Sequence, residues 1–290
     1  MAEEAWGRWG ADDERGALNF ICADKVLEAV SLVSKGEVIS LAQKLSTRMA
    51  IPPHRPSMQH FMGRDGADYA AGARRPGGFQ FAEDTLILPL HSGTHIDGLC
   101  HAWCDDRLYN GYRADTIRST GAAHLGVDKL PPIVTRGVLL DFVAIKGRPL
   151  ADGEVIGLEL LVEACRRAGA ELRRGDAVLL RTGWLEAQAG VATVDFTTEP
   201  GLDVEGGLFL AEAEVALVGA DNFAIEVLPF PFGEVFPVHQ RLIRDYGIPL
   251  LEGLVLDQLA AAGASHFLFV AAPLPVVGGT GSPLTPVAVL

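Results

Sequence analysis

The stretch from Gly157 to Asn222 constrains the fold most, because apolar helices and strands alternate along it. GLELLVEACRRAGAEL spaces its apolar residues as an amphipathic helix does, and Gly169 is its expected end. GDAVLLRTGW is then a short apolar run typical of a buried strand, and GLFLAEAEVALVGADN predicts a helix leading into another strand. This alternation favours helices packed against a mixed sheet.

The flanking segments continue the alternation. Residues 24–33 have helical apolar spacing, and GEVISLAQKL, TLILPLH and TRGVLLDFVAI predict strands. PVHQRLIRDYG predicts a helix, with Pro237 in its first turn and Gly247 as its stop. HFLFVAAPLPVV is expected to be the last strand, before a Gly- and Pro-rich tail. Because no linker or charge run divides the chain, we expect one α/β (mixed α+β) domain over residues 1–290.

The composition argues against several kinds of partner. A formal net charge of -13 and a pI near 5.0 repel phosphate backbones and anionic lipid, so we expect neither nucleic acid nor membrane as a partner. The polar start MAEEAWGRWG lacks the pattern of a signal peptide, and FLFVAAPLPVV is too short and too rich in Pro to span a bilayer. Four cysteines in such a chain are typical of reduced thiols. We therefore expect a cytoplasmic enzyme with a small-molecule substrate.

Residues 46–83 differ from the rest of the chain in being rich in Pro, Gly and Arg. A long irregular segment inside a compact domain is commonly functional, and this one precedes a histidine cluster, which favours a lid. Phe61 and Phe79 in this segment could line an apolar pocket with Trp103 and Phe230, although core packing explains these residues at least as well.

Three of the eight histidines lie within residues 91–101, HSGTHIDGLCH. A helix would turn Asp97 away from the histidines, and the Gly and β-branched residues are poor helix formers. A straight strand would put the polar side chains on one face but hold His91 and Asp97 about 20 Å apart. Ligands bind one ion at about 2.0–2.2 Å, so the chain must curl. We expect Gly93 and Gly98 to permit the curl through positive φ.

The kinds of side chain in the cluster indicate a metal. Imidazole nitrogens with a carboxylate oxygen and no thiolate favour Zn²⁺ or Mn²⁺. The alternative is a polar loop whose histidines are exposed by chance. Cys100 and Cys104 flank His101 but have no second Cys/His pair for a structural zinc site. A nucleophilic Cys100 is disfavoured, because adjacent residues of a strand point to opposite sides.

The same eleven residues resemble the signature H-x-G-T-H-x-D-x-P-x-H of the metal-dependent cyclase family, which includes bacterial kynurenine formamidases and isatin hydrolases. Leu99 stands where the signature has Pro. The similarity is with the longer branch of the family and extends to WGADDERGALNF, GDAVLLRTGW, GADNFAIEVLP and PVHQRLIRDYGIPLLEGLVLDQLA. It implies a single domain of the swivelling β/β/α type, with a mixed sheet or barrel-like core flanked by helices. It also implies a homo-oligomer, either a dimer or a tetramer.

The resemblance further implies a set of site residues. Its metal ligands would be His91, His95, Asp97, His239 and Glu252. His101 would move protons, a role that suits its ordinary pKa of about 6.5. Asp97 could bridge two ions, so the number of ions stays open.

These residues imply a metal-dependent hydrolase that cleaves a carbonyl C–N or C–O bond in a small cyclic or aryl amide, imide or lactone by metal-activated water. Two alternatives are a biosynthetic cyclase or dehydratase that uses the same site without attack by water, and a non-catalytic small-molecule binder.

Overall fold

The structure, a computed structural model, describes residues 5–230 and 233–290. Within these residues, one sheet of nine strands has the order β1, β15, β13, β7, β9, β11, β12, β4, β14. Its strands are β1 (Val38–Ser40), β4 (His95–Asp97), β7 (Ile133–Asp141), β9 (Ala177–Arg181), β11 (Leu217–Ala220), β12 (Leu250–Glu252), β13 (His266–Ala271), β14 (Gly281–Pro283) and β15 (Val287–Val289). The sheet is curled as a half-barrel and flanked by helices, which confirms the predicted mixed α/β fold with a barrel-like core.

The centre of the sheet is parallel and its margins are antiparallel. β7, β9, β11 and β12 pair in parallel, whereas β13 and β4 run antiparallel to their neighbours. β9 is an almost continuous buried apolar run, as expected for a parallel strand covered on both faces. β13 alternates buried and half-buried residues, which suits an antiparallel strand near the sheet margin.

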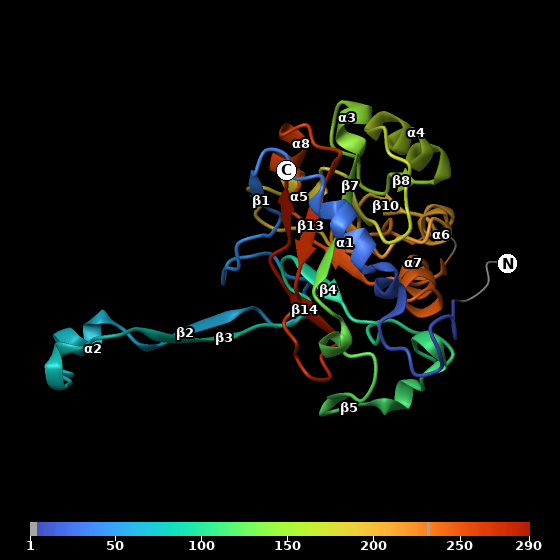
Figure 1. Cartoon of the computed structure of the whole chain (residues 1–290). Coiled ribbons are helices and arrows are strands. Elements are labelled where there is room, and N and C mark those ends of the chain that lie inside the picture. The colour runs from blue at the N-terminus through green and yellow to red at the C-terminus, as the bar shows by residue number, and fades with distance from the viewer. Residues whose placement is uncertain (1–4, 231–232) are drawn as a thin grey trace.

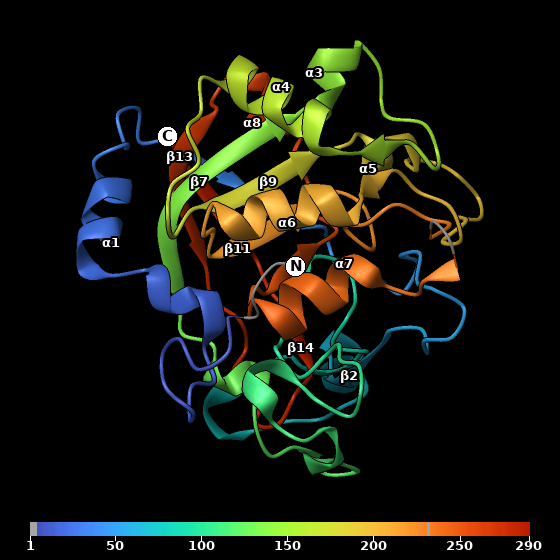
Figure 2. The same cartoon turned by 90° about the vertical axis from the view of Figure 1, so that its right-hand side faces the viewer.

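Helices cover the sheet. They are α1 (Ala23–Val30), α3 (Phe142–Lys146), α4 (Leu158–Ala168), α5 (Trp184–Ala187), α6 (Val204–Glu212), α7 (Pro237–His239) and α8 (Asp257–Ala261). Figure 2 shows α4 and α6 lying in front of β7, β9 and β11, with α7 next to α6. Gly169 ends α4 at a φ of 59°, as predicted. α7 continues as a π-helix over Gln240–Asp245, and the predicted stop Gly247 follows at a φ of 65°.

Several predicted strands differ from the observed ones. TRGVLLDFVAI is a strand only to Asp141, whose side chain accepts a hydrogen bond from the Ala144 N–H and so caps α3. GEVISLAQKL is a strand only over Val38–Ser40. The prediction that HFLFVAAPLPVV is the last strand is wrong, because the Gly- and Pro-rich tail pairs with the sheet as β14 and β15.

Most of the segment predicted as a lid forms a hairpin. β2 (Gln59–Arg64) pairs antiparallel with β3 (Glu83–Ile87), and α2 (Gly66–Ala70) lies between them. This hairpin, residues 59–87, is called the arm below, and it projects far out from the rest of the molecule (Figure 1). Closure of the segment over a site stays a prediction. Among the described residues, no helix is long and apolar enough to cross a membrane.

Candidate functional site

The histidine motif enters the sheet through β4, which lies between β12 and β14. In this register His95 pairs with Glu252 of β12 on one side, and Asp97 pairs with Gly281 of β14 on the other. His239 comes from α7. Side chains distant in sequence thus meet at one margin of the sheet.

Asp97 lies at the centre of the candidate ligands. Its Oδ1 accepts a 2.7 Å hydrogen bond from His91 Nδ1 and lies 3.8 Å from His95 Nε2, and its Oδ2 lies 3.8 Å from His239 Nε2. Glu252 lies 3.1 Å from His95 Nε2 and 3.3 Å from His239 Nε2. The structure therefore brings together all five residues that the resemblance implied as ligands.

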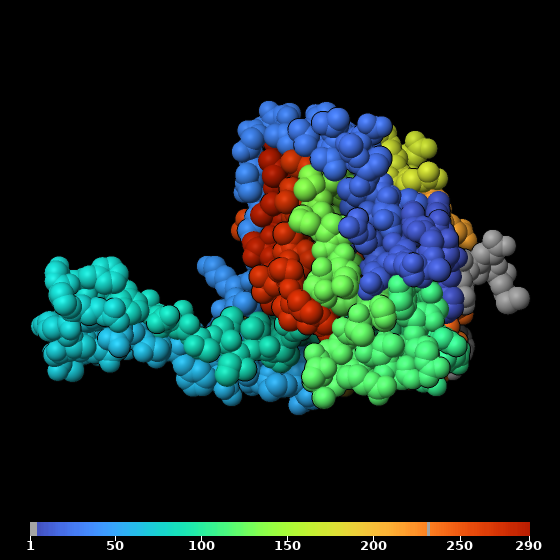
Figure 3. All heavy atoms as spheres, turned by 60° about the horizontal axis from the view of Figure 1, so that its bottom comes forward, coloured from blue at the N-terminus to red at the C-terminus, as the bar shows by residue number. Residues whose placement is uncertain are grey.

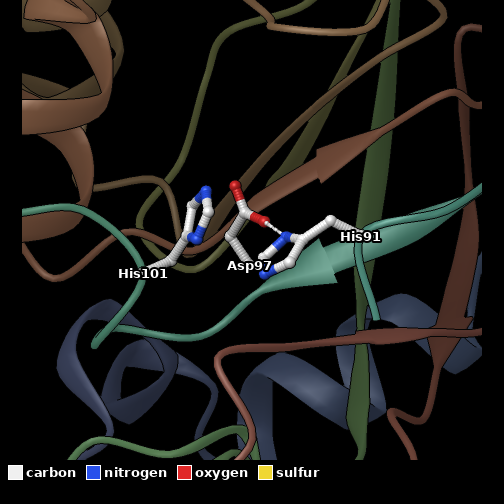
Figure 4. A group of neighbouring side chains, drawn as sticks. All are labelled: His91, Asp97 and His101. Atoms are coloured by element: carbon white, nitrogen blue, oxygen red, sulfur yellow. Dashed lines mark hydrogen bonds and ion pairs between the residues drawn. The ribbon is translucent and has the colours of Figure 1, made fainter. Parts of the chain in front are cut away.

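His101 borders the same group. Its ring centroid lies 4.0 Å from that of His91 and 6.3 Å from that of His239. Figure 4 shows His101 and His91 on either side of the Asp97 carboxylate. Burial lowers the pKa of His101 to about 4, against a smaller opposing effect of Asp97, so its imidazole is neutral at neutral pH. A neutral ring can accept a proton, but a pKa of about 4 makes it a weaker base than the ordinary value of about 6.5 predicts.

The predicted curl of the motif is present, but one of its two glycines acts differently. Gly93 has a φ of 60°, as expected. The prediction for Gly98 is wrong, because Gly98 is absent from the residues with positive φ in the described chain. Glycine is favoured at position 98 because a side chain has little room there: a Cβ would lie 3.1 Å from the Thr280 carbonyl oxygen. Gly281 is similarly required, because its Cβ would lie 2.6 Å from Cε1 of His91.

Unpartnered buried atoms test whether this cluster fits a metal. His95 Nε2, Asp97 Oδ2 and Glu252 Oε1 are buried and have no hydrogen-bond partner. Leaving such an atom unsatisfied costs about 1–3 kcal/mol. Atoms bound at about 2.1 Å to one ion lie roughly 3–4 Å apart, which matches the separations around Asp97. The cluster fits a divalent cation.

Two groups of possible ligand atoms share Asp97. One consists of His91, Asp97 and His101, and the other of Asp97, His239 and Glu252, with the atoms of each group within 4.8 Å of one another. The first group includes His101, which the resemblance implied as a proton carrier.

The electrostatic field of the cluster favours positive charge. Burial opposes the charged form of His239, yet the nearby carboxylates of Glu226 and Glu252 raise its pKa to about 10. Glu252 and Asp97 likewise raise the pKa of His95 against the effect of burial. The carboxylates that favour a proton here would equally favour a metal cation.

Two supporting residues were not assigned from the sequence. Glu226 accepts a 2.6 Å hydrogen bond from His239 Nδ1 and also bonds the His239 N–H, which fixes the ring. Thr280 Oγ1 lies 3.0 Å from His91 Nε2. Glu226 falls within GADNFAIEVLP but has no sequence signal of its own, and Thr280 lies in a Gly-rich tail without any recognised motif. Only the fold places them beside the histidines.

A pocket of about 760 Å³ opens beside His91 and His95. It lies where β9, β11 and β12 end, the edge at which ligands bind in open α/β sheets. One side is an aromatic wall, defined as Trp184, Phe196 and Phe223, with ring centroids 6.1 Å and 5.0 Å apart in succession.

The aromatic wall differs from the residues suggested by the sequence. Phe61 and Phe79 are exposed on the arm and Trp103 is exposed elsewhere, so none of these three lines the pocket. Phe230 packs edge-to-face on Phe236 and is also absent from the lining. Trp184 begins α5, and Phe196 and Phe223 come from loops, where periodicity gives no signal.

Comparison with known proteins identifies the family. Residues 39–227 match the family model named Cyclase. The chain belongs to the cyclase family. Among solved structures, one described as a novel cyclase is 34% identical, with a TM-score of 0.92 over 99% of this chain and 98% of that one.

Two further comparisons link this cyclase-family chain to isatin hydrolases. The Roseibium aggregatum protein named isatin hydrolase is 27% identical over 220 residues, which are 72% of this chain and 75% of that protein. Isatin hydrolase A from Ralstonia solanacearum is 23% identical, with a TM-score of 0.64 over 87% of this chain and 91% of that one. The second likeness is one of fold alone.

The cysteines of the cyclase-family chain are free thiols, as expected. Burial raises the pKa of Cys100 to about 12, so the thiolate needed for nucleophilic attack is scarce at neutral pH. This agrees with the sequence argument against a cysteine hydrolase.

Proposed function

We propose that this chain is a metal-dependent hydrolase that cleaves a carbonyl C–N or C–O bond in a small cyclic or aryl amide, imide or lactone. The observation that carries the proposal is the convergence of unpartnered buried atoms from His95, Asp97 and Glu252 beside a pocket. The Roseibium aggregatum relative named isatin hydrolase supports the reaction class. Imidazole and carboxylate donors favour Zn²⁺ or Mn²⁺ as the ion.

The candidate ligands and the residues that contact them would have separate roles. His95, Asp97, His239 and Glu252, with His91, would hold the ion. A bound divalent ion lowers the pKa of water towards about 7 and polarises a carbonyl oxygen. The hydrogen bond from His239 Nδ1 to Glu226 leaves its Nε2 directed at Asp97 and Glu252.

His101 is placed to move the proton. Its neutral ring can accept a proton released by the attacking water and donate it to the leaving nitrogen or oxygen. Its position beside His91 keeps this transfer close to the candidate ligands.

The aromatic wall would bind the apolar part of the substrate. Trp184, Phe196 and Phe223 present rings to the pocket, and Arg55 stacks over Phe223 with its Cζ 5.0 Å from the ring centroid. Arg55 Nη1 also donates a 2.6 Å hydrogen bond to the His91 carbonyl oxygen. A planar group on the wall would thus place its carbonyl towards the histidines.

Metal analysis and a substrate panel test the proposal. We expect purified protein to contain Zn²⁺ or Mn²⁺ and to open at least one of isatin, N-formylkynurenine, a succinimide-type imide or a lactone. A chelator should abolish turnover, and added metal should restore it. Bound metal without hydrolysis of any compound would favour the dehydrative cyclase instead. Protein that takes up no metal would favour the non-catalytic binder.

A further inference from the structure

Two buried polar atoms outside the candidate ligands belong to residues that line the pocket. Among the described residues, the buried side-chain atoms without a hydrogen-bond partner are three atoms of the candidate ligands together with Ser92 Oγ and Trp184 Nε1. Ser92 is 3% exposed and Trp184 is 4% exposed, and both line the pocket. A buried indole N–H usually finds a hydrogen-bond partner, so these two atoms require an explanation.

The two residues lie at different parts of the pocket lining. Ser92 directly follows His91, at a position that the H-x-G-T-H signature leaves open. Trp184 begins α5 and belongs to the aromatic wall, where its ring packs against Phe196. A substrate with its carbonyl at the candidate ligands and its planar part on the aromatic wall would therefore contact both residues.

A hydrogen-bond network fixes the turn that carries Trp184. The Trp184 N–H donates a 3.1 Å hydrogen bond to Thr182 Oγ1, and this hydroxyl donates a 2.6 Å hydrogen bond to Asp221 Oδ1. Asp221 Oδ2 accepts a 2.7 Å hydrogen bond from the Gly183 N–H, and the Asp221 side chain is buried. Because this network orders the start of α5 without a ligand, binding does not have to order the turn.

The arm takes no part in the pocket. Figure 3 shows it extending away from the rest of the molecule, and no residue from 59–87 lines the pocket in the described part of the chain. Residues 49–52, which precede the arm, do line it. Recognition of a ligand inside the pocket thus depends on the loops at the edge of the sheet.

The chemistry of the lining indicates what the two atoms bind. An indole N–H can only donate, so the partner of Trp184 must be an acceptor. Glu186, Asp221 and Asp257 line the pocket, whereas Lys44 is the one lysine that does so among the described residues. This excess of carboxylates disfavours an anionic partner. A neutral acceptor, such as a carbonyl oxygen, fits better.

We propose that Trp184 Nε1 donates a hydrogen bond to a second, neutral acceptor oxygen of the substrate, and that Ser92 Oγ bonds the carbonyl group that lies at the candidate ligands. The inference rests on the proposed function, because it takes the pocket as the substrate site. It makes Trp184 the residue that selects planar compounds with two carbonyl groups over those with one. A buried donor left unpaired penalises an analogue that lacks the acceptor.

Matched ligands test this selectivity. Phthalimide and isoindolinone differ by one carbonyl oxygen, and so do isatin and oxindole. In at least one pair, the dicarbonyl compound should bind about tenfold more tightly than its partner, as judged by dissociation constants from stopped-flow measurements before turnover. Equal dissociation constants within both pairs would overturn the proposal.

Variants separate the two donors. Trp184→Phe keeps an aromatic ring but removes the N–H, so it should abolish the preference for the dicarbonyl compound. Ser92→Ala should weaken both members of a pair by about tenfold and keep the preference. Trp103→Phe, at an exposed position outside the lining, should change neither. Unchanged affinities in the Trp184 or the Ser92 variant would reject the role of that residue.

The indole signal of Trp184 tests the hydrogen bond directly. Isotope-labelled protein has four tryptophan indole N–H groups, and the signal missing from Trp184→Phe identifies Trp184. The dicarbonyl compounds should move this signal downfield, and their partners should move it less. A signal that does not respond would overturn the proposal. Neither binding nor the spectrum requires turnover. Selective binding without hydrolysis would therefore reject only the hydrolase, and hydrolysis without selectivity would reject only the role of Trp184.

Discussion

His101 differs from its neighbours in what its ring contacts. His91 bonds Asp97 and Thr280, and His239 bonds Glu226, whereas the described contacts of His101 are ring contacts with other histidines. Because the described contacts of the His101 side chain are ring contacts, replacing His101 should leave the candidate ligands in place.

His101→Gln is therefore expected to keep its metal and to lose turnover by about 10²–10⁴-fold in kcat, the usual contribution of a positioned acid or base. Elemental analysis and steady-state kinetics on the same preparation would measure both. His54→Gln, at an exposed position, serves as the control. Loss of metal in the His101 variant would make it a ligand, and retention of full activity would remove it from the mechanism.

Glu226→Gln tests whether Glu226 holds the candidate ligand His239 in place. The carboxylate accepts from both the ring and the backbone N–H of His239, and a neutral amide would hold the ring less firmly. We expect metal affinity to fall by about 10–100-fold, as for other residues that orient metal ligands. Competition with a fluorescent chelator gives the affinity, and the exposed Glu159→Gln is the matched control. An unchanged affinity would mean that the ring is held by packing alone.

Among the elements, a buried ion cluster joins α1 to the sheet. Asp176, immediately before β9, accepts hydrogen bonds from Lys25 Nζ at 2.6 Å and from Arg136 Nε and Nη2 at 2.9 and 2.6 Å. All three side chains are buried. Removing the carboxylate would leave two cations without their shared counter-ion.

Asp176→Asn should accordingly lower the free energy of unfolding by about 3–5 kcal/mol. Glu163→Gln, which removes the carboxylate partner of the exposed Arg166 on α4, should leave it almost unchanged. Urea unfolding followed by circular dichroism would compare them. Equal effects of the two substitutions would show that burial adds nothing to this cluster.

Elements with local signals could be predicted from the sequence, and elements that depend on distant partners could not. α4 has apolar spacing and a terminal glycine within its own residues. β14 is three residues of a Gly- and Pro-rich tail, and only pairing with β4 makes it a strand. The end of β7 depended on the capping side chain of Asp141, which apolar periodicity does not reveal.

On the scale of the whole molecule, the candidate site also contains residues with a local sequence signal, which could be predicted, and residues from distant elements, which could not. The sequence of residues 91–101 alone indicates the candidate metal donors and shows that the chain must curl to bring them together. His239 and Glu252 could be joined to it only through the family resemblance, because nothing in their spacing points to β4. The aromatic wall was missed, since its rings come from the start of α5 and from two separate loops that only the curled sheet brings together.

The insertion of β4 between β12 and β14 has a consequence for the order of synthesis. Residues 95–97 leave the ribosome before both strands that flank them, β12 and β14, have been made. Domains acquire their structure as units while translation proceeds from the N-terminus. A nascent chain halted before residue 281 thus carries the complete motif without its second neighbouring strand, so the candidate site can form only after β14 has been made.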